Sequence, residues 1–351
     1  MRKKGALFFL LLLSIAAVSL RNVRGKDKGP RAPEKLSEWG FFKGDPADLE
    51  PADHVLLYEL NTPLFSDYAY KQRLVVVPAG KSIQYSAGEA FDFPDGSILV
   101  KTFYYPADFR KPAKGRRIIE TRVLQKENGV WNFYPYLWNE EQTEAYYDVS
   151  GTVKQVSYTD LSGKKRQETY VVPNKNQCKS CHEFNGKSIP IGPAARHLNR
   201  TVQHAGVDVS QLQLWKNRFG LEGMPAEADI PKNAVWNDAA SGSVAQRARA
   251  YLDINCGHCH RPGGQASTSG LYLYAQESDS TRLGINKPPV AAGRAAESFR
   301  FSIEPGYPEK SILIYRMRSL DPGIMMPEVG RRRNDEEALQ LISEWIAGMK
   351  K

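Results

Sequence analysis

The chain has 351 residues, of which 41% are hydrophobic and 25% charged, and its formal net charge is +9. This length predicts two or three domains of roughly 100–200 residues each, and the near-average composition excludes both a wholly disordered and a collagen-like protein. Residues 1–25 hold five basic side chains and no acidic one, which leaves 43 basic against 39 acidic residues in the remainder. That excess is too small to predict a nucleic-acid partner.

The N-terminus has the pattern of an export signal. Arg2, Lys3 and Lys4 precede an uncharged run from Gly5 to Leu20, which is typical of a secretory signal peptide. The run is short for a membrane-spanning helix, which needs about 20 apolar residues. We therefore expect residues 1–25 to be a cleaved leader and the mature protein to be periplasmic or otherwise exported. The alternative is a protein anchored by an uncleaved leader, and no other segment resembles a membrane span.

Residues 26–36 are charged and contain proline, which predicts a linker, and residues 37–175 predict a β-rich domain. Asn128-Gly129 is a strong hairpin signal, and Ser162-Gly163 marks a second turn. The fold expected here is all-β, sandwich or barrel-like. The strands that its β-branched and aromatic runs predict are Leu74–Val77, Ile98–Tyr105, Arg117–Leu124, Val130–Trp138, Val153–Tyr158 and Glu168–Val172.

The remainder of the chain predicts mostly helices. Residues 176–242 predict short helices and loops, among them a helix over Val209–Phe219, and residues 243–351 form a further segment. The whole is therefore expected to be an α+β multidomain protein, with an all-β module followed by a mostly α region. The helices expected in the last segment are Ser243–Asn255, Lys310–Ser319 and Glu336–Met349, the last with Leu339, Ile342, Trp345 and Ile346 on one face.

The four cysteines fall into two identical patterns. Cys178-Lys-Ser-Cys181-His182 and Cys256-Gly-His-Cys259-His260 both read C-x-x-C-H, the pattern of covalent c-type haem attachment. In that chemistry two thiols bond to the haem and the adjacent histidine ligates the iron. Since no cysteine is left over, we expect two covalent, iron-containing c-type haems, with His182 and His260 as proximal ligands. His258, inside the second motif, is expected to be exposed.

Three other interpretations use the same cysteines. A paired C-x-x-C zinc site usually has about 15–20 residues between its pairs, whereas Cys181 and Cys256 lie 75 positions apart. A redox dithiol needs a thioredoxin-like βαβ context, which the sequence does not contain. Plain disulfides are the remaining alternative for an exported protein.

Several motifs outside the cysteines carry a resemblance. The helix into Cys256–His260, the late Met326-Pro327 and the closing helix resemble a class I cytochrome c domain. Over residues 37–349 the chain is also similar to a family of bacterial diheme c-type cytochromes with a β-rich N-terminal module. That resemblance implies electron transfer and no named substrate. Its matching stretches are Pro63–Ala69 (PLFSDYA), Phe91–Pro94, Leu99–Phe103, Glu120–Arg122, Trp138–Glu140, Asn176–His182, Pro190–Pro193 and Tyr251–Cys256.

The resemblance implies the sixth ligand of the second haem only, and the candidates for the first haem come from the sequence. Met326 is the expected sixth ligand of the second haem, with Met325 as its rival and a core gap-filling role as the alternative. A thioether ligand raises the reduction potential. For the first haem the candidates are Met224, which we favour, His197, His204, or no protein ligand.

The function expected from these residues is single-electron transfer between redox partner proteins, and we assign no catalytic residue. The alternative is a diheme peroxidase or oxidase-type enzyme with one open haem site. Arg331-Arg332-Arg333 is a solvated charge run or a docking patch for an acidic partner. Arg196 and Arg261 are candidate partners of haem propionates. The aromatic residues Trp131 to Trp138 are interpreted as core, with a ligand-binding surface as the alternative.

Overall fold

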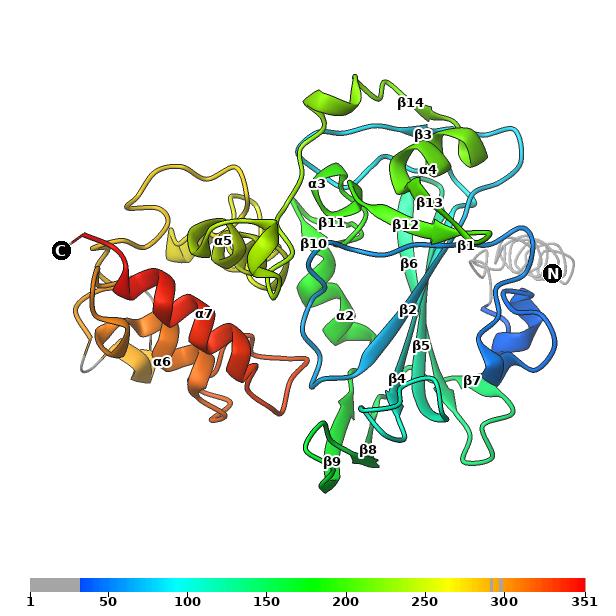
Figure 1. The fold of residues 1–351 in the computed structure, drawn as a ribbon, viewed down its shortest axis with the longest axis horizontal. Coiled ribbons are helices and arrows are strands. Elements are labelled where there is room, and N and C mark those ends of the chain that lie inside the picture. Colours follow the sequence, from blue (N-terminus) through cyan, green and yellow to red (C-terminus); the bar gives the residue numbers. More distant parts are fainter. Residues whose placement is uncertain (1–31, 291–292, 297–298, 351) are drawn as a thin grey trace, which may run out of the picture. The chain divides into compact units, whose positions relative to one another are not determined.

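The computed structural model describes residues 32–290, 293–296 and 299–350. It has a mixed α/β fold, with a large antiparallel sheet followed by the six α-helices α2–α7 among these residues (Figure 1). Residues 34–351 make one compact unit, so the domain boundaries expected within it stay predictions. The expected leader, 1–25, and most of the linker, 26–36, lie outside the described residues. None of the described helices is both long and apolar enough to span a bilayer.

The main sheet has six strands in the order β1-β2-β4-β5-β6-β7, and all neighbours are antiparallel. The strands expected over 98–105, 117–124 and 130–138 are confirmed as β4, β5 and β6. Since the order has two ends, β1 and β7 are sheet edges and the sheet is open, so the expected barrel closure is not observed. The six strands are β1 (Leu56–Leu57), β2 (Tyr70–Val76), β4 (Ile98–Pro106), β5 (Arg116–Glu127), β6 (Val130–Trp138) and β7 (Ala145–Tyr147).

Two hairpins appear where the turn residues predicted them. Asn128 and Gly129 join β5 to β6 with φ values of 50° and 76°, the left-handed pair that a two-residue type I′ turn requires. The second hairpin joins β8 (Thr152–Thr159) to β9 (Lys165–Val172). It packs beside the main sheet, where Val156, Tyr170 and Val172 share a core with Phe103 and Tyr105.

One face of the main sheet holds the first core. Val75, Leu99, Leu124 and Phe133 stand opposite one another on four adjacent strands, and because side chains alternate along a strand they share one face. The cluster around them includes Cys178 of α2 (Lys175–His182) and Trp215 of α4 (Gln211–Phe219). On the opposite face, the rings of Trp39 and Tyr134 lie 5.9 Å apart.

The C-terminal helices form a second core. α5 (Val244–Asn255), α6 (Ile312–Arg318) and α7 (Glu336–Ala347) bury Leu252, Ile314 and Ile342 together, which confirms the three helices expected there. Figure 1 shows α2 between the main sheet and these helices.

One expected helix starts later than predicted. The segment Val209–Phe219 begins as a strand, because Ser210 ends β13 and its side chain accepts a hydrogen bond from the backbone N–H of Gln213, which caps α4. The remaining short elements are β3 (Ile83–Gln84), β10 (Glu183–Phe184), β11 (Lys187–Ser188), α3 (Ala195–Leu198), β12 (Thr201–His204), β13 (Val207–Ser210) and β14 (Leu221–Glu222).

Candidate functional site

The first C-x-x-C-H motif occupies the end of α2. Asn174 and Gln177 start this helix with a reciprocal capping box. Cys178 and Cys181 are three residues apart, which places them on neighbouring positions of one helix face. Cys178 is buried in the first core, and the ring of His182 lies 5.0 Å from that of Phe133 on β6. The sheet therefore supports the first motif directly.

The second motif is a tight turn at the end of α5. Cys256 caps the helix, and its carbonyl oxygen accepts the N–H groups of Cys259 and His260, at 3.1 and 2.8 Å. A Cβ atom on Gly257 would lie only 2.5 Å from the carbonyl oxygen of Asp253. The turn therefore requires glycine inside the motif.

Both motif histidines are held in the same tautomer. Nδ1 of His182 lies 2.7 Å from the carbonyl oxygen of Ile189, and Nδ1 of His260 lies 3.2 Å from that of Leu271. Because a carbonyl oxygen only accepts, each Nδ1 must carry the proton. Burial lowers the pKa of His182 and of His260 to about 4, so both rings are neutral at pH 7. Each Nε2 therefore keeps a free lone pair, the state in which imidazole binds a metal.

The two motifs contact each other across a narrow cleft. The thiol of Cys181 lies beside Cys259 and His258, and Sγ of Cys259 lies 4.0 Å from the carbonyl oxygen of Ser180. These contacts with Cys259 and His258 lower the pKa of Cys181. The expectation that His258 is exposed is wrong, because the ring is half-buried in this contact.

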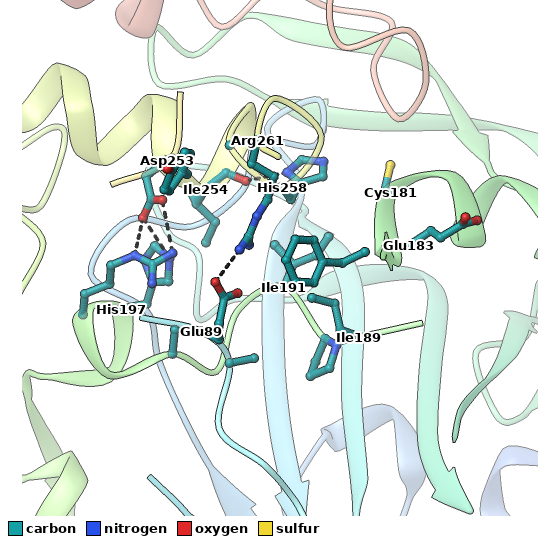
Figure 2. Close-up of a pocket in the computed structure, with 17 residues that line it drawn as sticks. Glu89, Cys181, Glu183, Ile189, Ile191, His197, Asp253, Ile254, His258 and Arg261 are labelled. Carbon is teal, nitrogen blue, oxygen red and sulfur yellow. Dashed lines mark hydrogen bonds and ion pairs between the residues drawn. The ribbon is translucent and has the colours of Figure 1, made fainter. Parts of the chain in front are cut away.

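Residues that follow each motif extend the contact. The N–H of Asn185 donates to the carbonyl oxygen of Gly263 at 3.0 Å, and the guanidinium of Arg261 lies 3.9 Å from the centre of the Phe184 ring. Figure 2 shows side chains from both segments around the cleft. Its free volume is about 30 Å³, far below the roughly 300–1,000 Å³ of ligand pockets. The cleft is therefore the place where side chains of the two motif segments meet.

The Met326 loop lies beside the second motif. Met326 is half-buried and Met325 is 5% exposed. Charges on this loop act on the motif cysteines: Arg331 interacts with Cys256, and Glu328 with Cys259. The structure thus brings the expected ligand's loop to the expected motif.

The structure corrects the interpretation of Arg331 as part of a solvated charge run. Its side chain is 6% exposed, and Nη2 donates to the carbonyl oxygens of Ser319 and Arg316 at 2.8 and 3.2 Å. Nε donates to the carbonyl oxygen of Met326 at 3.2 Å. Arg332 and Arg333 are exposed. Arg331 therefore ties the Met326 loop to the end of α6, since it joins the carbonyl oxygen of Met326 to those of Arg316 and Ser319.

The candidate ligands of the first motif are placed differently from one another. Met224 is half-buried and packs against the core cluster that contains Cys178. His197 is 1% exposed and its Nε2 lies 3.2 Å from Asp253. His204 is exposed on β12. Nδ1 of His197 has no hydrogen-bond partner among the described residues, but it is fully buried, whereas Met224 is only partly buried.

A buried carboxylate that sequence reasoning missed lies between the segments that carry the motifs. Asp253, 3% exposed, accepts Nε of Arg196 at 2.6 Å, Nη2 of Arg196 at 3.1 Å and Nδ2 of Asn233 at 2.9 Å. It also accepts the N–H of Ala275 at 2.8 Å. Burial by itself would raise the pKa of Asp253, but His197 and Arg196 more than offset it, so the pKa is lowered. The cluster fixes α5 to α3.

These contacts also show what the two arginines singled out from sequence do. The guanidinium of Arg196 uses its other donor on the carbonyl oxygen of Gly88, at 2.6 Å. Arg261 forms an ion pair with Glu89 (Figure 2). Both are thus engaged with protein groups around the cleft.

The PLFSDYA motif of the β-rich region holds the Met326 loop in place through hydrogen bonds. The carboxylate of Asp67, 5% exposed, accepts the N–H groups of Arg332 and Arg333, each at 2.8 Å. The hydroxyl of Tyr68 donates to the carbonyl oxygen of Asn334 at 3.0 Å. The sequence showed the motif itself, but it gave no indication that the motif contacts the Met326 loop.

The four cysteines, all in the described part of the chain, carry free thiols. Across the described ranges, no three or more His, Cys, Asp or Glu side chains gather as a set that could hold a metal ion. Comparison with known proteins finds no matching family model, curated protein or solved structure.

Replacing Asp253 by asparagine will destabilise the fold strongly. The variant leaves the buried guanidinium of Arg196 without its counter-charge, which typically costs about 3–5 kcal/mol. Urea unfolding measures this loss. The matched control is Asp238→Asn at an exposed 3-10 cap, expected within about 0.5 kcal/mol of wild type. Equal stabilities for the two variants would contradict the role given to Asp253.

Acid will weaken the fold through His197. Burial lowers its pKa from 6.5 to about 4, so between these values the unfolded chain binds a proton that the folded chain does not. Stability therefore falls as pH falls, by about 1.4 kcal/mol per pH unit for this one proton. In His197→Gln the free energy of unfolding should therefore fall less steeply between pH 6.5 and 4, by about 1.4 kcal/mol per pH unit. Identical slopes in the two proteins, measured by urea unfolding, would rule this out.

Asp67→Asn will loosen the Met326 loop. The amide keeps the side chain's shape but loses the charge that strengthens hydrogen bonds from two N–H groups, so we expect a loss of about 1–2 kcal/mol. Limited proteolysis should also cut residues 321–334 faster. Asp95→Asn, which touches one exposed N–H, is the control. If the loop in Asp67→Asn resists protease as well as it does in wild type, Asp67 does not hold the loop.

Proposed function

We propose that the protein is an exported diheme c-type cytochrome that passes single electrons between redox partner proteins. The observation that carries the proposal is the pair of C-x-x-C-H motifs, each with a neutral histidine whose Nε2 is free, in contact with each other in one chain. A disulfide role would require neither feature.

The donor set fits c-type haem on three counts. Each motif offers two free thiols on one side of a turn, followed at once by the histidine. Each histidine donates its Nδ1 proton to a backbone carbonyl, the outer hydrogen bond that typically orients a metal-bound imidazole. The third count is Met326, in a loop that Arg331 holds beside the second motif.

We assign the residues as follows. Cys178 and Cys181 would hold one haem and Cys256 and Cys259 the other, with His182 and His260 on the iron. Met326 would complete the second site, and Met224 is the candidate for the first. A bound haem supplies one-electron redox chemistry. The protein sets its potential through ligand identity and burial.

The contact between the motifs supports a relay and not two independent carriers. Cys181 and Cys259 would each bear a haem bond, so the two attachment edges meet where their thiols meet. An electron that enters at one motif then has its next acceptor within the same chain. Asp253 and Arg196 keep the geometry fixed, because they tie α5 to the segment after α2.

The test is to produce the chain in a host that attaches c-type haem and to measure haem per chain by mass and by the pyridine haemochrome. We expect two haems in wild type and one in Cys178→Ser/Cys181→Ser. Ferric absorption and EPR should show low-spin centres. Met326→Ala should lose a methionine–iron charge-transfer band that the neighbouring control Met325→Ala retains.

Other outcomes redirect the proposal. A high-spin ferric centre that binds cyanide and turns over peroxide would favour the enzyme alternative. A chain that carries no covalent haem under these conditions overturns the proposal.

A further inference from the structure

A row of three cations crosses the face of the main sheet that carries the first motif. Arg73 on β2 stands opposite Lys101 on β4, and Lys101 stands opposite Arg122 on β5. The row lies next to the apolar row that ends at Phe133, two residues along each strand, so it shares that face. Lys71, on β2, lies one step further along.

Such an arrangement destabilises the sheet unless anionic groups balance the positive charges. Like charges directly opposite each other on neighbouring strands destabilise a sheet, and Lys and Arg are almost never buried without partners. Here Arg73 is 8% exposed. Burial, and then the charges of Arg122 and Arg73, lower the pKa of Lys101 to about 7.

The described residues satisfy only one of these three cations, Arg122. Glu120 is the one carboxylate in the adjoining row, and it is already bound by Arg122 at 2.5 and 2.7 Å and by the hydroxyl of Tyr170. Neither Arg73 nor Lys101 has a side-chain hydrogen bond to any described residue; Lys101 only lies 5.1 Å from the centre of the Phe103 ring.

Groups on neighbouring elements leave the row positive. Glu59 interacts with Arg73, but it pairs with Arg200 at 2.9 Å. Asp335 interacts with Lys71. Arg73 and Lys101 thus lack the anionic oxygens that a guanidinium and an ammonium would bind.

The position of the row points to the first motif. Lys101 interacts electrostatically with both His182 and Cys178, and Arg122 interacts with Cys178. Adjacent strands are about 4.8 Å apart, so the row extends roughly 10 Å from Arg122 to Arg73 across β4. From Arg122 on β5 the row runs across β4 to Arg73 on β2, away from the part of the sheet that lies nearest Cys178.

We propose that Arg73 and Lys101, beside the ion pair of Arg122 with Glu120, form a carboxylate-binding site that holds the propionates of the haem attached at Cys178 and Cys181. This inference rests on the proposed function. Free oxyanions such as inorganic phosphate offer the same negatively charged oxygens, so the experiment must distinguish them from haem propionates. The assignment replaces Arg196 and Arg261 as the expected propionate partners, since those two are engaged by Asp253 and Glu89.

The experiment measures both haem reduction potentials of the full, haem-loaded chain. Lys101→Met and Arg73→Met should each make one haem harder to reduce, by about tenfold in the equilibrium constant, which is 59 mV for one electron. The other haem should not change. The control Lys165→Met removes an exposed cation from β9 and should move neither potential. Lys101→Gln serves if the Met variant does not fold.

Inorganic phosphate separates the two sources. Added phosphate should leave the wild-type potentials unchanged if propionates occupy the row. A phosphate-dependent shift in wild type that is absent from Lys101→Met would overturn the propionate assignment in favour of free oxyanions. Unchanged potentials in all row variants, with both haems attached, would overturn the site altogether.

The same variants distinguish this failure from a failure of the proposed function. If no haem attaches to the chain, the proposed function fails and the propionate assignment fails with it. Melting of the haem-free chain then tests the row alone: phosphate should raise the melting temperature of wild type and not that of Lys101→Met. No rise in wild type would overturn any oxyanion role for the row.

Discussion

The ion pair between Asp253 and Arg196 is the constraint on which the arrangement of both motifs depends. Asp253 lies in α5, one turn before Cys256, and Arg196 lies in α3, fourteen residues after His182. A buried carboxylate is tolerated only when its oxygens are fully bonded, and here Arg196, His197, Asn233 and the N–H of Ala275 supply the donors. Any displacement of α5 relative to α3 would expose or orphan this charge, so the distance between the motifs is set by it.

A second group of buried charges fixes the Met326 loop. Arg331 joins the carbonyl oxygen of Met326 to the end of α6, and Asp67 accepts the N–H groups of the next two residues from the β-rich side. The loop has little regular structure of its own. Two side chains of opposite charge, Arg331 and Asp67, hold it in place. Such an arrangement gives a loop methionine the fixed position that a ligand needs.

Local patterns predicted the elements well, and long-range charge pairing explains what they missed. The type I′ turn at Asn128-Gly129 and the apolar face of α7 depend on residues close in sequence, so both could be predicted. The bond from Asp67 to Arg332 spans 265 positions and that from Arg196 to Asp253 spans 57. A single sequence contains no signal for such pairs, and the ordinary expectation for an arginine run is a solvated surface, which Arg331 contradicts.

The comparison of these buried charges separates structural from ligand-binding roles. Around Asp253 and Arg331 every charged group meets oxygens or N–H groups of the protein itself, so those clusters need nothing further to be stable. The row on the sheet is built differently: cations face cations across β2, β4 and β5, and the nearest carboxylate, Glu120, is already shared by Arg122 and Tyr170. Selection for stability alone would have replaced Lys101 by an apolar residue like Leu99, which lies on the same face of β4 two residues away, because burial of an unpaired ammonium is costly. The row is therefore best understood as half of an interaction whose other half arrives with a bound anion.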